Sequence, residues 1–258
     1  MTPKEQRISF KSKDGVTLRG ILTTPGEKAK EAVIFAHGIT GEKDEGGLYA
    51  KLSRLFAGKG VESLRFDFRG HGESGGKPWT VTIKGELDDL AAAVDLVRAR
   101  GYEKVAIIGF SFGGGITVLY AGRKPRNVSC ITLLCPVLDY RKTFLEPETA
   151  EAAKWFSPEA IARAKRTGRL DLAGFPLGHG LLKELSRYKP GQTLLKLEVP
   201  CLIIHGTDDN MVPYTVARYY GRKYEKGEFL SVKRASHSFK GFEGRIAPTI
   251  TNWVLKWI

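Results

Sequence analysis

The chain has 258 residues, of which 42% are hydrophobic and 27% charged, values that are typical of a folded globular domain and not of a disordered chain. Its formal net charge is +13, but the basic residues are scattered among acidic ones along the whole chain, so the charge does not indicate a nucleic-acid-binding arm. The polar N-terminus, the lack of a membrane-length apolar stretch and three cysteines in apolar runs predict a cytoplasmic protein with reduced thiols.

Two strand-like runs open the chain. Residues 7–12 and 17–23 flank an Asp-Gly pair, a pattern that predicts an antiparallel hairpin. The first fully apolar strand follows at 32–36 and ends in the tripeptide His-Gly-Ile, residues 37–39. At the carboxyl end of an inner strand, this turn would leave the backbone N–H of Ile39 over the edge of the sheet, where it could donate to an oxyanion. A plain glycine-rich turn is the alternative.

The next elements alternate between strand and helix. An apolar run at 61–66 continues into the segment DFRGHGES, residues 67–74. Residues 81–100 carry apolar side chains three and four positions apart, which predicts an amphipathic helix that ends at Gly101. Because strands and helices alternate from residue 32 onward, we expect a mostly parallel, doubly wound sheet with helices on both of its faces.

A glycine-rich turn around Ser111 lies at the centre of the predicted site. A short buried strand at 105–108 precedes Gly-Phe-Ser-Phe-Gly, residues 109–113, and a helix-like stretch follows. Glycines on both sides of the serine permit the close backbone approach of a sharp strand-to-helix turn, so the pattern G-x-S-x-G predicts a nucleophile elbow. This turn would expose the Ser111 hydroxyl at a helix N-terminus and place the N–H of Phe112 beside a developing negative charge.

The alternation of strand and helix stops after Leu134. The stretch at 136–196 is longer than a crossover needs, and it contains a helix-like piece and an aromatic, glycine-rich segment. The alternation resumes with a strand at 199–205 that runs into GTDDNMVP, and a last strand precedes the loop ASHSF. A carboxylate just past a strand end is suited to orient a histidine, but the adjacent Asp208 and Asp209 leave the choice open.

The order of these motifs is similar to that of a known superfamily. A His-Gly turn, then DFRGHGES, GFSFGG, HGTDDNMVP and SHSF resembles the α/β-hydrolases, and within them the small serine esterases of the cinnamoyl/feruloyl esterase and carboxylesterase branch. The resemblance implies the α/β-hydrolase fold, with a core at 1–138 and 197–258 and a cap or lid at 139–196. The superfamily pattern G-x-x-D-x-x-V-P favours Asp209 as the acid, with Asp208 as a turn residue.

The position of each histidine then separates a catalytic candidate from structural ones. His37 and His205 end strands within His-Gly turns, and His71 lies in DFRGHGES, which is a structural turn in the superfamily. His179 stands between glycines in the insertion. His237 alone follows the acid in a loop after a strand, which gives the order serine, aspartate, histidine that the resemblance implies.

These residues predict a serine hydrolase that cleaves carboxylic esters with short-to-medium acyl or aryl groups through an acyl-enzyme, without cofactor or metal ion. Phe110 stands where many relatives carry histidine, and we expect it and Phe175 of the insertion to contact the substrate. A prolyl-type aminopeptidase, an acyltransferase or perhydrolase, and a non-catalytic ligand receptor are the alternatives. The expected partner is a small ester and not nucleic acid or a membrane, and an oligomer is compatible with the sequence. The scarcity of Asn and Gln is typical of thermophilic proteins.

Overall fold

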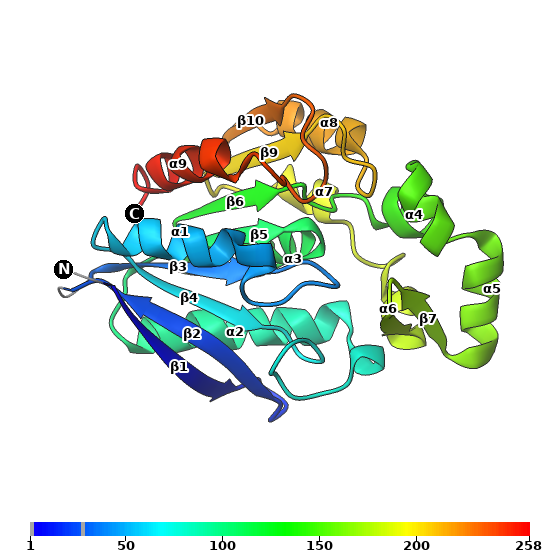
Figure 1. Ribbon diagram of the computed structural model, residues 1–258, viewed down its shortest axis with the longest axis horizontal. Helices are drawn as coiled ribbons and strands as arrows, with labels where there is room; N and C mark the ends of the chain where they lie inside the picture. Colours follow the sequence, from blue (N-terminus) through cyan, green and yellow to red (C-terminus); the bar gives the residue numbers. More distant parts are fainter. Residues whose placement is uncertain (1–2, 27–28) are drawn as a thin grey trace.

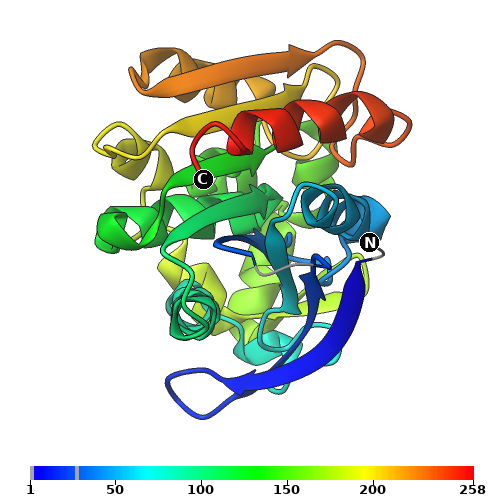
Figure 2. The ribbon, with the colours of Figure 1, turned by 90° about the vertical axis from the view of Figure 1, so that its left-hand side faces the viewer.

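The computed structural model describes residues 3–26 and 29–258, and its centre is one eight-stranded sheet (Figure 1). The strands follow the order β1-β2-β4-β3-β5-β6-β9-β10 across this sheet. Figure 2 shows how the sheet twists from the blue N-terminal hairpin to the orange strand β10. The bounds of its strands are β1 Lys4–Lys11, β2 Thr17–Thr24, β3 Glu31–Ala36, β4 Glu62–Asp67, β5 Lys104–Phe110, β6 Cys130–Leu134, β9 Cys201–Gly206 and β10 Gly227–Val232.

The N-terminal hairpin is the antiparallel part of the sheet. β1 pairs antiparallel with β2, and β2 pairs antiparallel with β4, whereas the pairs from β4 to β10 are parallel. The hairpin turns at the Asp-Gly pair, where Gly15 has a φ of +86°, a conformation that glycine adopts without strain. The prediction of a mostly parallel sheet that opens with an antiparallel hairpin is confirmed.

Helices cover both faces of the sheet because apolar strand residues alternate between two cores. Val33 and Phe35 of β3 belong to one core, which α1 and α9 cover, and Ile34 belongs to the other, which α2, α3 and α8 cover. The bounds of these helices are α1 Leu48–Ala57, α2 Ile83–Ala99, α3 Ser111–Arg123, α8 Tyr214–Lys223 and α9 Glu243–Val254. Short 3₁₀ turns lie at Glu45–Gly47, Pro78–Thr80 and Pro125–Asn127.

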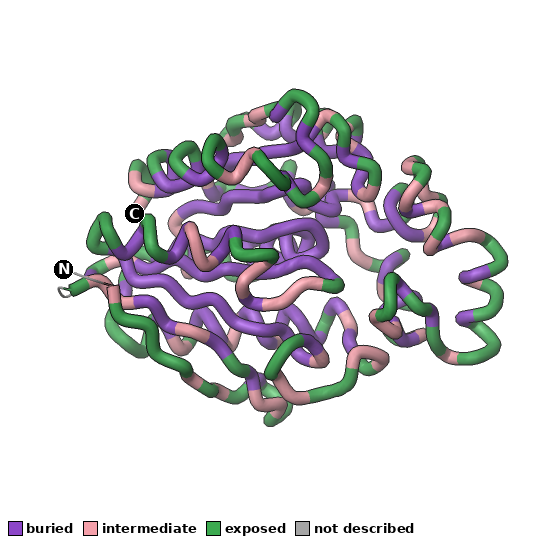
Figure 3. The backbone as a smooth tube through the Cα atoms, viewed as in Figure 1, coloured by how far each residue is buried: buried purple, intermediate pink, exposed green. Residues whose placement is uncertain are grey.

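The segment between β6 and β9 extends beyond the carboxyl ends of the parallel strands (Figure 1). At the C-terminal end of this segment, α7 returns to the core and packs on α3, where Gly122 leaves room for Thr193. Figure 3 shows buried residues along the central strands and mostly exposed or intermediate residues along the outer part of this segment. Its elements are a π-helical turn at Arg141–Leu145, α4 Ala150–Trp155, α5 Pro158–Thr167, β7 Arg169–Leu172, β8 Phe175–Gly178, α6 His179–Glu184 and α7 Pro190–Leu194.

The state of the cysteines and the character of the helices can be compared with the sequence-based predictions. Cys130, Cys135 and Cys201 are buried and unpaired, which agrees with the predicted reduced core thiols. Within the described ranges, no helix combines the length and the apolar character needed to cross a bilayer.

Candidate active site

The predicted elbow is a tight junction between β5 and α3. Ser111 is the first residue of α3 and has a φ of +52°, a left-handed conformation that strains any residue with a β-carbon. Glycine is required on both sides, because a β-carbon at Gly113 would overlap the carbonyl oxygen of His37 and one at Gly109 would overlap the Thr117 hydroxyl. The strain at Ser111 is therefore imposed by close packing between α3 and the ends of β3 and β5.

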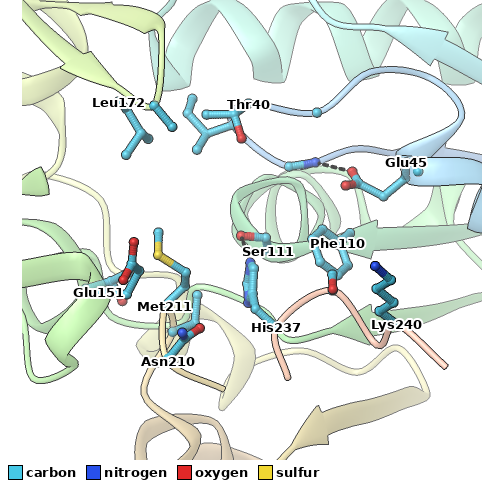
Figure 4. Close-up of a pocket in the computed structure, with 18 of the residues that line it drawn as sticks. Thr40, Glu45, Phe110, Ser111, Glu151, Leu172, Asn210, Met211, His237 and Lys240 are labelled. Atoms are coloured by element: carbon cyan, nitrogen blue, oxygen red, sulfur yellow. Dashed lines mark hydrogen bonds between the residues drawn. The ribbon is translucent and has the colours of Figure 1, made fainter. Parts of the chain in front are cut away.

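The structure brings Ser111, His237 and Asp209 into one hydrogen-bonded row. Ser111 Oγ lies 3.1 Å from His237 Nε2, and His237 Nδ1 lies 2.8 Å from Asp209 Oδ2 (Figure 4 shows the serine and the histidine). With the Nδ1 proton donated to the carboxylate, Nε2 is free to accept the serine proton. Asp208 is exposed and accepts a bond from the Thr207 hydroxyl, so the first of the two aspartates faces away from this row.

Asp209 is held from both of its carboxylate oxygens. Its Oδ1 accepts the N–H groups of Met211 and Val212 at 2.9 and 2.8 Å, and His205 Nε2 lies 3.0 Å from Oδ2. Burial raises the pKa of Asp209, but the opposing effect of His237 and His205 is larger and holds that pKa below its usual range. Asp209 is therefore an anchored, ionised carboxylate. The contact with His205 was not predicted from the sequence, although this histidine is the last but one residue of β9 and lies four residues before the acid.

Ile39 and Phe112 are the two residues whose backbone N–H groups the sequence predicts as oxyanion donors. Ile39 follows β3 and lines the same pocket as Ser111, while Phe112 is the second residue of α3, where backbone N–H groups have no partner within the helix. Among the described residues, neither the Ile39 nor the Phe112 N–H has a hydrogen-bond acceptor. Both donors are therefore available to a ligand atom.

Side chains from other segments fix the turn that carries Ile39. The Gly38 N–H donates to Glu45 Oε2 at 2.8 Å (Figure 4). His37 Nε2 accepts the Phe68 N–H at 2.9 Å, so its proton is on Nδ1, which donates to the Gly38 carbonyl at 2.8 Å. Burial raises the pKa of Glu45 to about 7, although the Gly38 N–H and His237 oppose the shift. Glu45 is a site residue that sequence motifs did not indicate.

A pocket of about 740 Å³ opens over Ser111 between the core and the inserted segment. Figure 4 shows Glu45, Phe110 and Lys240 on one side of the serine, and Glu151, Leu172 and Met211 on the other. The wall is mostly apolar with a few charged groups, which is typical of sites for small organic molecules. Its main apolar residues are Ile39, Leu48, Phe110, Phe144, Trp155, Leu172, Ala173, Met211 and Val212.

The two phenylalanines predicted to contact substrate have different places. Phe110 lines the pocket, and its ring centroid lies 5.0 Å from that of His237. Phe175 is not among the pocket-lining residues; its ring stacks on His71 instead, with centroids 4.5 Å apart and an interplanar angle of 17°. The prediction for Phe175 is therefore corrected, because the flat imidazole of a core histidine occupies the face that was expected to meet substrate.

A metal-like grouping at the site is better explained by the hydrogen-bonded row itself. Possible ligand atoms of Cys135, Asp209 and His237 lie within 4.8 Å of one another. Burial raises the pKa of the Cys135 thiol well above its usual range, and the nearby Asp209 charge raises it further. A neutral thiol is a poor metal ligand, and the other two residues already bond to each other.

Known protein sequences resemble this chain over most of its length. The chain is 28% identical to the uncharacterized protein YfhR of Salmonella typhimurium over 268 residues, covering all of this chain and 82% of that protein. It is 26% identical to a monoacylglycerol lipase of Mycolicibacterium smegmatis over 233 residues, covering 81% of each chain.

Solved structures show the same fold over nearly the whole chain. Est1E of Butyrivibrio proteoclasticus, solved with ferulic acid bound, superposes with a TM-score of 0.84 at 22% identity, covering 97% of this chain and 98% of that one. The Pyrococcus furiosus esterase Pf2001 gives a TM-score of 0.77 at 20% identity, covering 99% and 92%. The family model described as serine aminopeptidase, S33, matches residues 27–175, more than half of the chain. The fold is thus that of the α/β-hydrolases, and the chain belongs to the S33 serine aminopeptidase family of hydrolases.

Proposed function

We propose that this protein is a serine esterase that hydrolyses small carboxylic esters through an acyl-enzyme. The observation that carries the proposal is the row from Asp209 through His237 to Ser111 at the floor of the pocket. The names of two similar proteins support ester chemistry, one a monoacylglycerol lipase and the other the Pyrococcus furiosus esterase Pf2001.

In the first half of the proposed reaction, Ser111 attacks the ester carbonyl. His237 Nε2 takes the hydroxyl proton as Oγ bonds to the carbonyl carbon, and the Asp209 carboxylate stabilises the resulting imidazolium. The N–H groups of Ile39 and Phe112 hold the oxygen that becomes negative. His237 then returns the proton to the departing alcohol, which leaves the acyl group on Ser111.

In the second half, water releases the acyl group by the same machinery. His237 takes a proton from the attacking water, and the same two N–H groups stabilise the second tetrahedral intermediate. Protonation of Ser111 Oγ by His237 then expels the carboxylic acid and restores the enzyme. An acyltransferase would differ only in the acceptor that replaces water.

We assign residues 139–196 as a cap that sets the choice of ester. Its Trp155 and Leu172 line the pocket together with Phe110 and Met211 of the core, and this apolar lining suits short-to-medium acyl or aryl groups. An aminopeptidase would need an acidic anchor for the substrate amine, and Glu151 is the cap carboxylate in the pocket. Its oxygens are engaged by Lys154 at 2.7 Å and by the Trp155 indole at 3.3 Å, which argues against that role.

The decisive experiment compares esters with an amide on purified protein. We expect hydrolysis of p-nitrophenyl acetate, p-nitrophenyl butyrate and methyl ferulate, and little release from an aminoacyl p-nitroanilide. The variant Ser111→Ala tests the nucleophile, and Ser236→Ala, which changes an exposed serine beside His237, is its matched control. An anilide turned over faster than the esters would assign the protein as a peptidase instead.

We further propose that the protein is cytoplasmic and comes from a thermophilic source. The three buried free thiols support a reducing compartment such as the cytoplasm. Charged networks around buried arginines, such as Arg65 with Glu5 and Asp44 and Arg69 with Asp14 and Asp89, support a thermophilic source.

A further inference from the structure

The stacked pair of Phe175 and His71 joins the cap to the turn that carries Ile39. Phe175 begins β8 of the cap, and His71 lies in the core segment after β4. Besides stacking on Phe175, the His71 ring contacts the ring of His37 edge to face, with centroids 4.9 Å apart. His71 is buried, so its position is set by its neighbours and not by solvent.

His71 holds the backbone of Ile39 directly. Its Nε2 lies 2.7 Å from the Ile39 carbonyl oxygen, and its Nδ1 lies 2.9 Å from the Arg69 carbonyl oxygen. Burial lowers the pKa of His71, although both carbonyls favour its charged form, so the ring is neutral and has one N–H. With its proton on Nε2, the ring donates to the Ile39 carbonyl, which is the closer of the two.

Both peptide groups that flank the Ile39 α-carbon are therefore held by histidines. His37 Nδ1–H donates to the Gly38 carbonyl, which belongs to the same peptide group as the Ile39 N–H. His71 Nε2 lies within hydrogen-bond distance of the Ile39 carbonyl in the next peptide group. Because a peptide group is planar, fixing its carbonyl also fixes the direction of its N–H. His37 therefore fixes the direction of the Ile39 N–H, and His71 restrains the turn from the other side of the Ile39 α-carbon and through its contact with the His37 ring.

The cap side of the stack is anchored as well. Gly178 at the end of β8 packs so closely on the Trp79 backbone that a β-carbon there would overlap it. The Arg169 guanidinium of β7 lies 4.1 Å from the centroid of the Trp79 ring. The two strands of the cap hairpin are thereby fixed to the 3₁₀ turn at Pro78–Thr80, close to the segment that holds His71. Phe175 is therefore presented to the imidazole by a hairpin docked on the core.

We propose that Phe175 is a positioning residue for catalysis, because it holds His71 and through it the Ile39 N–H that stabilises the oxyanion. The cap then contributes to the hydrolysis of every ester, including acetates. This inference goes beyond a cap that only selects substrates, and it rests on the proposed esterase function and on Ile39 as an oxyanion donor.

The size of the effect follows from the role of the N–H. Deleting a side-chain oxyanion donor lowers kcat by about 10²–10³ in enzymes where it has been measured. Loosening a backbone donor without deleting it should cost less, so we expect kcat to fall about tenfold in Phe175→Ala. KM for a small ester should stay within about twofold, because Phe175 does not line the pocket.

The first test measures kcat and KM on p-nitrophenyl acetate for wild type, Phe175→Ala and Phe175→Tyr. The tyrosine variant keeps the stacked ring and should keep wild-type kcat. Tyr188→Ala is the matched control, since it removes another half-buried aromatic ring of the insertion that packs near Arg123 and not near His71. Circular dichroism and thermal melting confirm that each variant is folded.

The second test exchanges the imidazole for amides of different reach. A glutamine amide can place its nitrogen near the position of Nε2, and an asparagine amide near that of Nδ1. His71→Gln should therefore retain most of kcat, while His71→Asn should lose about as much as Phe175→Ala. These variants keep the inference testable even if Phe175→Ala does not fold.

A transition-state analogue provides the readout that simple destabilisation would not change. A short alkyl trifluoromethyl ketone adds reversibly to the serine: Oγ bonds to the carbonyl carbon, His237 receives the hydroxyl proton, and the carbonyl oxygen becomes an oxyanion. Its inhibition constant should rise in Phe175→Ala by about the factor lost in kcat. Unchanged acetate kcat and unchanged inhibitor affinity in folded Phe175→Ala protein would overturn the inference. So would a change confined to KM for methyl ferulate, which would make Phe175 a contact of the bulky acyl group.

The controls separate this inference from the proposed function. If wild type does not hydrolyse esters, or if Ser111→Ala still does, the esterase proposal itself fails. If wild type is active, Ser111→Ala is inactive and the Phe175 and His71 variants match wild type on acetate, only the positioning role fails.

Discussion

The two halves of the candidate site are built in different ways. On the acid–base side, Ser111, Asp209 and His237 each follow the end of a strand, and the bonds that position them are local to those ends or join the three residues to one another. On the proposed oxyanion side, the turn that carries the Ile39 N–H is held by His37 itself, by side chains from the β4–α2 segment and from the turn before α1, and indirectly by Phe175 of the inserted segment. The acid–base half therefore follows from local sequence motifs, whereas the oxyanion half depends on tertiary packing.

The largest effect on kcat is expected from removing the nucleophile on the acid–base side. Ser111→Ala should lower kcat for p-nitrophenyl butyrate by about 10⁵–10⁶, and adding His237→Ala should change the rate little further because the residues act as a unit. Steady-state kinetics of both variants beside Ser236→Ala checks this. Residual turnover well above these values in pure Ser111→Ala protein would place the nucleophile elsewhere.

The next effect separates the two neighbouring aspartates. Asp209→Asn should lower kcat by about 10⁴, because the amide no longer stabilises the imidazolium or fixes its tautomer. Asp208→Asn changes an exposed residue that faces Thr207 and should cost less than about tenfold. Side-by-side kinetics of the two variants would reassign the acid if the order were reversed.

Glu45 tests the oxyanion side through stability and not through rate. In the folded protein it keeps its proton up to about pH 7, whereas its ordinary pKa is 4.5. Between these values the folded state binds more protons than the unfolded state, so stability falls as pH rises. The loss should approach about 3 kcal/mol between pH 4.5 and 8, at about 1.36 kcal/mol per pKa unit.

The measurement for Glu45 is urea unfolding at several pH values. Wild type should lose stability across this window, and Glu45→Gln, which keeps an acceptor oxygen for the Gly38 N–H, should lose less. Glu103→Gln, at an exposed position, is the control. Parallel pH profiles for wild type and Glu45→Gln would show that Glu45 is not held neutral by its burial.

The smallest effect is expected on KM, from removing an apolar side chain by which the cap lines the pocket. Trp155→Ala should raise KM for methyl ferulate several-fold, because the variant loses apolar contact with a bulky group. KM for p-nitrophenyl acetate should change less, since its acyl group is much smaller than the feruloyl group. Trp257→Ala, at an exposed tryptophan outside the pocket, is the control. Equal changes for both esters would show that Trp155 does not select substrates.

The contrast between local motifs and tertiary packing also explains which parts of the fold and of the site can be predicted from the sequence. The alternation of strands and helices, the elbow and the residues Ser111, Asp209 and His237 can be predicted from apolar runs and from the motifs at their ends, which are local patterns. Glu45, the contact of His205 with Asp209 and the true place of Phe175 could not be predicted in this way. Each of these depends on which side chain fills the space beside a turn after the sheet has formed.

The left-handed backbone at Ser111 has a consequence for the evolution of this chain. A residue with a β-carbon in that conformation costs about 1–2 kcal/mol, a strain that glycine would not have. Selection for folding alone would therefore drive the position toward glycine, and only selection for turnover keeps a serine there. Relatives that have lost the reaction but kept the fold should show their first substitution at this residue, so its identity records whether a lineage is still under selection as an enzyme.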